Sequence, residues 1–134
     1  MTAVNSAESP TQLVLVVDDE PMILRSASMA LAMAGYQVIV AENGAAGLEL
    51  FLAAPDSIAL VITDVMMPLL NGLEMAQRIK ATRPGARIIL MSAYSDAVIL
   101  TMDGPKFPLI RKPFLPDDLL RAVKAHIDPP TATA

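Results

Sequence analysis

Five polar side chains stand directly after predicted strands, where a parallel sheet presents its carboxyl ends. They are two adjacent aspartates, a third aspartate, a serine and a lysine: Asp18, Asp19, Asp64, Ser92 and Lys112. A carboxylate can act as a nucleophile, and a hydroxyl or an ammonium can stabilise charge on a transferred group. Oxygen ligands without a neighbouring His or Cys favour a hard ion such as Mg²⁺. The residue types therefore indicate metal-assisted phosphoryl chemistry.

Taken singly, each of these side chains also has an ordinary structural explanation. Asp19 could cap the helix that contains Pro21, and Asp64 could begin a turn. Ser92 could be a turn hydroxyl, and Lys112 a solvated surface charge. Taken together, the three carboxylates repel one another, since two like charges ~4 Å apart cost about 4 kcal/mol at an effective dielectric of ~20. Mg²⁺ and Lys112 would balance their charge, so the second adjacent aspartate is predicted to hold a metal.

The same set of residues predicts a phosphoryl acceptor. Asp64 would attack phosphorus and form an acyl phosphate. Mg²⁺ and Lys112 would neutralise charge on the transferred group, while the Ser92 hydroxyl would donate a hydrogen bond to it.

Aliphatic and β-branched runs predict the strands that position these side chains. Four buried strands and a weaker fifth are expected at Leu13–Val17, Tyr36–Val40, Ile58–Thr63, Arg87–Met91 and Leu109–Arg111. Segments with helical spacing lie between them, and repeated strand–helix alternation implies a parallel sheet with helices on both faces. In such sheets, ligands bind beyond the carboxyl ends of the strands.

Helical spacing also predicts which residues face the core. The expected apolar faces are Met22, Ser26, Met29, Ala30 and Met33; Ala45, Leu48 and Leu52; Leu73, Ala76, Ile79 and Lys80; and Leu119, Ala122, Val123 and Ile127. A further short helix should start at Ser95 or Asp96 and stop by Gly104. The nine methionines are interpreted as mostly core residues, and His126 as a structural residue near a helix end.

Composition limits the function classes. The chain has 134 residues, 54% hydrophobic and 18% charged, which is enough for one globular domain. A net charge of −4 argues against nucleic-acid or anionic-membrane partners. The absence of cysteine removes disulfides and thiolate sites and is compatible with the cytoplasm. We expect a domain over residues 12–128 with disordered tails at 1–11 and 129–134; no secretory signal or membrane-spanning run is evident.

Four motifs, "VVDDEP", "VITDVMMPLLNG", "IILMSA" and "KPF", occur in this order. With them, the chain from about Gln12 to Ile127 resembles a receiver domain of two-component response regulators. The resemblance implies a flavodoxin-like (βα)5 fold with strand order 2-1-3-4-5. It also implies a cytoplasmic phosphoacceptor that takes its phosphoryl group from a histidine kinase or a histidine phosphotransfer protein. Its output would be a changed contact with a downstream protein, and its only enzymatic chemistry its own phosphorylation and dephosphorylation.

The resemblance also implies residue roles. Asp64 would be phosphorylated, and Asp19 and Asp64 would bind Mg²⁺ directly, with Asp18 assisting through water. The backbone carbonyl of Met66 would be a further ligand. Ser92 and Lys112 would occupy the family's hydroxyl and lysine positions, and the bond from Lys112 to Pro113 would be cis.

Two departures from the family pattern concern signalling. Receivers commonly carry Tyr or Phe three residues before the lysine, where this chain has Leu109. Glycine and two prolines in "DGPKFPLIRKPF" also replace the usual end of the fourth helix. We therefore expect the segment 93–108 to carry the switch, with Ser92, Tyr94, Phe107 and Leu109 as its candidate residues.

Other functions fit the sequence less well. A haloacid dehalogenase-type phosphatase would keep its nucleophile after the first strand in an Asp-x-Asp pattern, and a cap domain is missing. An interaction module with a vestigial pocket, or a receiver excised from a hybrid histidine kinase, stays open. A flavin site is disfavoured because there is no tryptophan, and no nucleotide-binding glycine loop occurs.

Overall fold

A five-stranded parallel sheet forms the centre of the computed structural model, which describes residues 12–67, 70–93 and 107–127. The strands are β1 (Leu13–Val17), β2 (Gln37–Ala41), β3 (Ile58–Asp64), β4 (Ile88–Ser92) and β5 (Leu109–Arg111). All four pairings are parallel and the strand order is β2-β1-β3-β4-β5. The predicted flavodoxin-like order is therefore confirmed.

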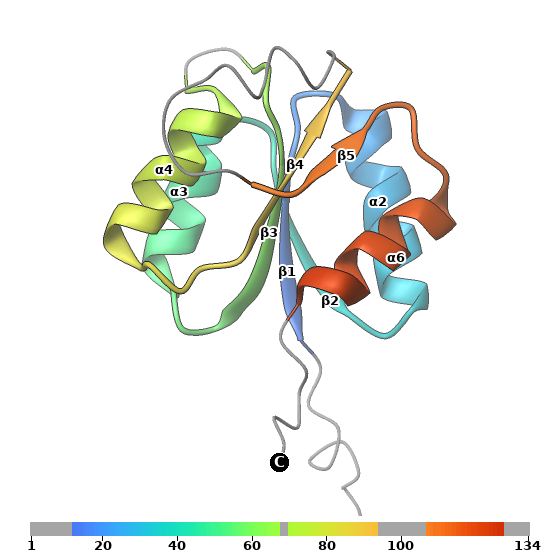
Figure 1. The fold of residues 1–134 in the computed structure, drawn as a ribbon, viewed down its shortest axis with the longest axis horizontal. Helices are drawn as coiled ribbons and strands as arrows, with labels where there is room; N and C mark the ends of the chain where they lie inside the picture. The colour runs from blue at the N-terminus through green and yellow to red at the C-terminus, as the bar shows by residue number, and fades with distance from the viewer. Residues whose placement is uncertain (1–11, 68–69, 94–106, 128–134) are drawn as a thin grey trace, which may run out of the picture.

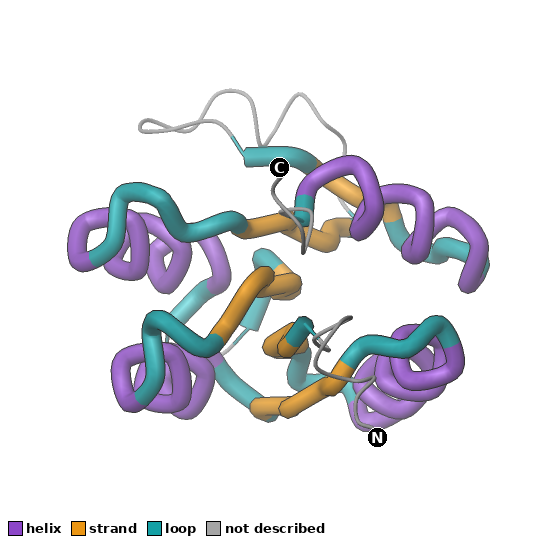
Figure 2. Tube along the Cα trace, turned by 90° about the horizontal axis from the view of Figure 1, so that it is seen from below, coloured by secondary structure: helices purple, strands orange, loops and turns teal. Residues whose placement is uncertain are grey.

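Helices cover both faces of this sheet, as predicted. The described helices are α2 (Pro21–Met33), α3 (Gly44–Ala53), α4 (Gly72–Thr82) and α6 (Pro116–His126). In Figure 1, α3 and α4 lie on one face and α2 and α6 on the other. Figure 2, seen from below, shows the same three layers. The short helix expected between Ser95 and Gly104 and the two expected tails lie outside the described residues. None of the described helices is long and apolar enough to cross a membrane.

The strands fill two cores because successive side chains point to opposite faces. On β1, Leu15 and Val17 pack with α3 and α4, whereas Val14 and Val16 pack with α2 and α6. β1 and β3 are buried on both faces, which explains their nearly continuous aliphatic runs. The central strands are thereby fixed, and with them the residues at their carboxyl ends.

The predicted core face of α2 is largely wrong, since only Ala30 of the predicted residues packs against the core. Its buried residues are Leu24, Ala27 and Leu31. Met22, Met29 and Met33 are instead 74%, 59% and 87% exposed. α2 carries two apolar stripes, so helical spacing alone could not decide between them. The stripe with the small residue Ala27 at its centre packs against the sheet.

The predicted core face of α3 is also largely wrong. Its buried residues are Gly44, Gly47 and Phe51, while Leu52 is 45% exposed. A Cβ at Gly47 would lie 2.8 Å from Val17 Cγ2 and 3.0 Å from the Met75 sulfur. The glycine face thus lets α3 approach the sheet more closely than a leucine face would.

The remaining two helices follow the prediction. α4 buries Ala76 and Ile79, and α6 buries Leu119 and Val123. The methionines within the described residues fall into two groups. Met67, Met75 and Met91 belong to the core, whereas Met22, Met29, Met33 and Met66 are exposed, so the prediction of mostly core methionines is wrong for this second group.

Candidate functional site

The carboxyl end of β1 places one aspartate in the interior and the next on the surface. Asp18 is completely buried, and its backbone N–H donates to the Ala41 carbonyl at 3.2 Å. Its Oδ1 accepts a hydrogen bond from the backbone N–H of Glu20 at 2.9 Å. Glu20 is the N-cap of α2 and makes no side-chain cap hydrogen bond. Asp19 is exposed and is not the helix cap, so that structural explanation fails.

Three carboxylates converge at this end of the sheet. One oxygen each from Asp18, Asp19 and Asp64 lies within 4.8 Å of the other two. Asp64 is the last residue of β3 and is 7% exposed. The buried Asp18 Oδ2 accepts no aligned hydrogen bond. An all-oxygen set of three carboxylates, two of them buried, fits a hard divalent cation such as Mg²⁺.

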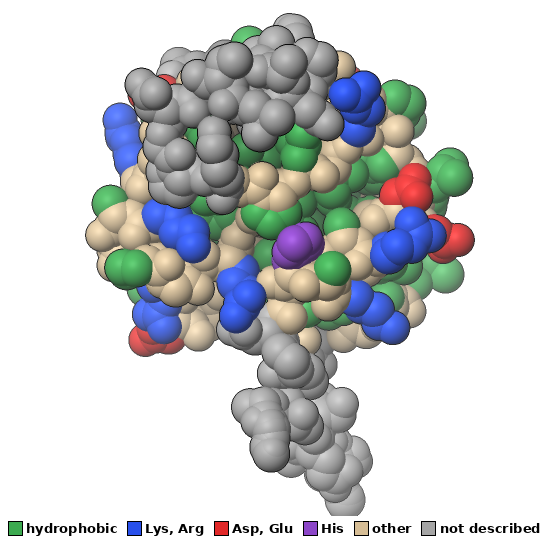
Figure 3. All heavy atoms as spheres, viewed as in Figure 1, with side chains coloured by type: hydrophobic (Ala, Val, Ile, Leu, Met, Phe, Trp, Pro, Cys, Tyr) green, Lys and Arg blue, Asp and Glu red, His purple; other side chains and the backbone are tan. Residues whose placement is uncertain are grey.

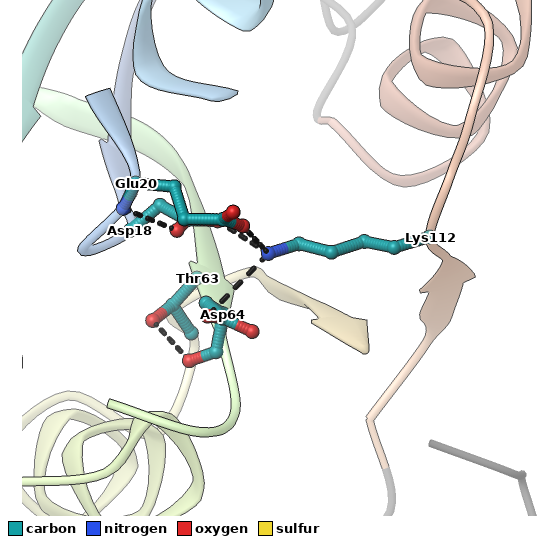
Figure 4. A network of polar contacts seen from close by, with 5 residues as sticks. All are labelled: Asp18, Glu20, Thr63, Asp64 and Lys112. Carbon is teal, nitrogen blue, oxygen red and sulfur yellow. Dashed lines mark hydrogen bonds and ion pairs between the residues drawn. The ribbon is translucent and has the colours of Figure 1, made fainter. Parts of the chain in front are cut away.

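Lys112 brings positive charge to this cluster from the other end of the sequence. Its Nζ lies 2.8 Å from Asp18 Oδ2, 3.4 Å from Asp64 Oδ2 and 3.4 Å from Glu20 Oε1 (Figure 4). Its backbone N–H donates to the Ser92 carbonyl at 2.8 Å, which ties the end of β5 to the end of β4. The bond between Lys112 and Pro113 is cis, as predicted.

Burial and charge together shift the pKa values of these groups. Burial raises the pKa of Asp18 although Lys112 and the Glu20 N–H oppose it. Burial, and then the charge of Asp18, raise the pKa of Asp64 to about 6. For Lys112, burial alone would lower the pKa, but Asp18 and Asp64 outweigh it and raise the pKa. The ammonium is therefore charged at neutral pH, beside carboxylates that its charge only partly compensates.

The backbone around Asp64 is held by close contacts. The Thr63 hydroxyl donates to the Asp64 carbonyl at 3.0 Å, and the Gly72 N–H donates to the Val65 carbonyl at 2.9 Å. A Cβ at Gly72 would lie only 1.8 Å from the Asp64 carbonyl oxygen. α4 can therefore begin against the end of β3 only if this position is glycine. The Asn71 side chain caps that helix by accepting from the Glu74 N–H at 2.8 Å.

Sequence reasoning missed three residues of this site: Glu20, Thr63 and Gly72. Glu20 stands next to the adjacent aspartates, so its position was a signal that it could reach the same cluster. The Asn-Gly pair at the start of α4 is a turn or cap signal, but a contact with Asp64 cannot be read from it.

The other candidates occupy different places. Ser92 ends β4 and is 1% exposed, and its neighbour Met91 pairs with Asp64 in the sheet register. Met66 is 53% exposed. Phe107 and Leu109 are partly buried, and both pack against the core between the sheet and the helices α3 and α4. Tyr94 lies outside the described residues.

His126 does not join the carboxylates. It is the last residue of α6 and lines a cavity of about 290 Å³ with Arg87, Ile88 and Phe107, at the amino ends of β4 and β5. Figure 3 shows Lys and Arg side chains around the histidine on this face. The histidine thus belongs to the end of the sheet opposite the carboxylates.

Replacing Asp64 by asparagine should stabilise the metal-free protein at pH 8 by about 1–3 kcal/mol. The pKa of Asp64 is raised to about 6, so the folded protein holds this proton more tightly than the unfolded chain. The charged carboxylate therefore costs stability above pH 6, and that cost disappears as the pH falls below about 4. Urea denaturation at pH 8, 6 and 4 measures the difference. An equal difference in unfolding free energy between the two proteins at all three pH values would contradict a raised pKa of Asp64.

The chain is similar in sequence to known proteins. The family described as the response regulator receiver domain matches residues 14–124. The transcriptional regulatory protein GlrR of Escherichia coli (strain K12) is 34% identical over 112 residues, which cover 81% of this chain and 24% of GlrR. KdpE of Mycobacterium tuberculosis (strain ATCC 25618 / H37Rv) is 34% identical over 124 residues, which cover 91% of this chain and 54% of KdpE. The chain thus spans about a quarter to a half of these relatives.

Solved structures agree with the sequence relatives. The response regulator TrrA from Thermotoga maritima, in complex with Mg(2+)-BeF, is 36% identical with a TM-score of 0.77, covering 86% of this chain and 98% of TrrA. A receiver domain protein from Clostridium thermocellum is 34% identical with a TM-score of 0.77, covering 85% of this chain and 92% of the other. The match over residues 14–124, on a fold with the predicted strand order and a carboxylate cluster at its carboxyl edge, shows that this chain belongs to the response regulator receiver domain family.

Proposed function

We propose that this protein is a phosphoacceptor in which Asp64 receives a phosphoryl group from a histidine kinase or a histidine phosphotransfer protein. Receiver domains are signalling domains of two-component systems, and phosphorylation is general to the family. The observation that carries the assignment to Asp64 is its membership of the carboxylate cluster at the carboxyl end of β3, with Lys112 Nζ 3.4 Å from Asp64 Oδ2. The proposal covers a domain at residues 12–128 that acts in the cytoplasm.

The proposed step is an exchange of one bond at phosphorus. A carboxylate oxygen of Asp64 attacks the phosphorus, the new P–O bond forms, and the bond to the donor nitrogen or oxygen breaks with its electron pair leaving on the donor. Lys112 neutralises charge on the phosphoryl oxygens, and the Ser92 hydroxyl donates a hydrogen bond to them. Hydrolysis of the acyl phosphate then restores the free carboxylate.

Receiver domains bind Mg²⁺ at an acidic pocket, and the residues here fit that ion. We assign Asp19 and Asp64 as direct ligands, the Met66 backbone carbonyl as a further ligand, and Asp18 as an assisting group that acts through water. When bound, Mg²⁺ would supply positive charge that stabilises the transferred group. Asp18 has a second task in this proposal, because its 2.8 Å contact holds the Lys112 ammonium at the pocket.

We further propose that phosphorylation of Asp64 signals to a downstream protein by changing protein contacts through the segment 93–108. Leu109 has no ring to turn inward, so the usual aromatic switch is replaced. Phe107 and Leu109 share one core cluster, which supports a common response at the start of β5. Amide hydrogen exchange with and without beryllofluoride should change most across this segment; an unchanged segment would exclude it as the output.

Labelling with acetyl phosphate tests the main proposal. With Mg²⁺ present, the wild-type protein should gain one phosphoryl group by intact-mass spectrometry, and Asp64→Asn should gain none. Removing Mg²⁺ with a chelator should suppress the wild-type labelling. Equal labelling of both proteins would place the phosphoryl group elsewhere. Sustained release of phosphate from small phosphomonoesters would instead favour a phosphatase, and no labelling at all would favour a vestigial pocket.

A further inference from the structure

We propose that Glu20 is a positioning residue that holds Lys112 in the unphosphorylated protein and opposes phosphorylation of Asp64. The inference rests on the function proposed above, because it concerns the lysine assigned to the phosphoryl group. Its starting observation is the 3.4 Å contact between Glu20 Oε1 and Lys112 Nζ, shown in Figure 4.

The ammonium of Lys112 is shared among three carboxylates. A lysine ammonium has three N–H donors and no acceptor. Here Asp18, Asp64 and Glu20 stand 2.8, 3.4 and 3.4 Å away. All three donors therefore have a carboxylate in reach. A phosphoryl group on Asp64 brings new anionic oxygens, so at least one existing contact has to be given up.

Burial decides which contact is lost. The Asp18 side chain is 0% exposed, and its Oδ2 has no hydrogen bond to replace the lysine. Leaving such a group without its cation is costly. The Glu20 side chain is 64% exposed, so water can solvate its carboxylate as soon as it leaves the ammonium. Phosphorylation itself removes the charge of the Asp64 carboxylate and so weakens that contact. Of the two contacts that stay charged, the one with Glu20 is lost at the lower cost.

This exchange gives Glu20 an effect of defined sign. Before phosphorylation, its carboxylate competes for the ammonium that the transferred group needs. Afterwards, the same carboxylate is a negative charge near the phosphoryl oxygens. Both effects favour the unphosphorylated state. Exposed ion pairs of this kind change equilibria by about two- to fivefold, and salt weakens them.

The substitution Glu20→Gln tests the proposal. It keeps the size of the side chain and the backbone N–H that binds Asp18, but it removes the charge. At saturating Mg²⁺ and low salt, we expect beryllofluoride to bind about two- to fivefold more tightly than to the wild type, as measured by isothermal titration calorimetry. Mg²⁺ affinity is measured separately, so that an effect on the metal is not mistaken for one on the phosphoryl mimic.

Two controls separate positioning from general charge and from folding. Glu42→Gln makes the same change in net charge just after β2, at the same end of the sheet, and should leave beryllofluoride affinity unchanged. The gain from Glu20→Gln should shrink at high salt, whereas a purely structural effect would not. Unchanged or weaker binding by Glu20→Gln, or an equal gain from Glu42→Gln, would overturn the inference. If the wild type itself failed to bind beryllofluoride with Mg²⁺, the proposed function would fail instead.

Discussion

Replacing Gly72 by alanine should lower the free energy of unfolding by about 3 kcal/mol or more. Overpacking against side chains that can move already costs about 1–3 kcal/mol. The added Cβ would meet the Asp64 carbonyl oxygen at 1.8 Å and its carbonyl carbon at 2.8 Å, and backbone cannot rotate away. Either α4 or the end of β3 must shift, so Asp64 would move with it.

Gly85 provides a matched control for this prediction. A Cβ at Gly85 would have nothing within 4 Å, so Gly85→Ala should change the unfolding free energy by less than about 0.5 kcal/mol. Urea denaturation compares the two variants under one condition. If Gly72→Ala were as stable as Gly85→Ala, the backbone at the end of β3 could shift without a loss of unfolding free energy, and the prediction would be wrong.

Replacing Lys112 by methionine should lower the stability of the metal-free protein by about 3–5 kcal/mol at pH 8. The lysine side chain is 11% exposed, and its partners Asp18 and Asp64 are 0% and 10% exposed. Removal of the cation leaves buried carboxylates that still carry charge. Their pKa values are already raised in the wild type and should rise further, so protonation at lower pH should restore much of the lost stability.

Two comparisons sharpen the Lys112 prediction. Lys124→Met removes an exposed lysine from the last turn of α6 and should change stability by less than about 0.5 kcal/mol. Adding Mg²⁺ should stabilise Lys112→Met more than it stabilises the wild type, because the ion then takes over the compensation of charge. Equal stabilisation of both proteins by Mg²⁺ would contradict the inference that Lys112 and the metal compensate the same carboxylate charges.

The sequence predicted the sheet well because its strands are short, apolar and ended by polar residues. Leu13–Val17 and Leu109–Arg111 match the structure at both ends, and the other strands differ by about one residue. The carboxylates could be placed together without coordinates, since parallel strands bring their carboxyl ends to one edge. Their residue types then limited the chemistry.

Helix orientation was harder to predict, because it depends on how closely a helix approaches the sheet. On α3, the leucine spacing predicts the core face, yet the face that packs against the sheet carries the glycines. On α2, both stripes are apolar, and only packing selects Leu24 and Leu31. Glu20 was missed because it stands beyond the two aspartates that follow β1, and only the folded structure shows that its carboxylate reaches Lys112.

Because some methionines are buried and others exposed, they can serve as natural spectroscopic probes of different parts of the molecule. There is no tryptophan to report on the pocket by fluorescence. Met91 pairs with Asp64 across the sheet, Met66 follows Asp64 by two residues, and Met75 lies in the core beside Gly47. Met29 and Met33 point to solvent on α2. Isotope labels on the methionine methyl groups would therefore report separately on the surroundings of Asp64, on the core beside α3 and on the outer surface, without any engineered residue.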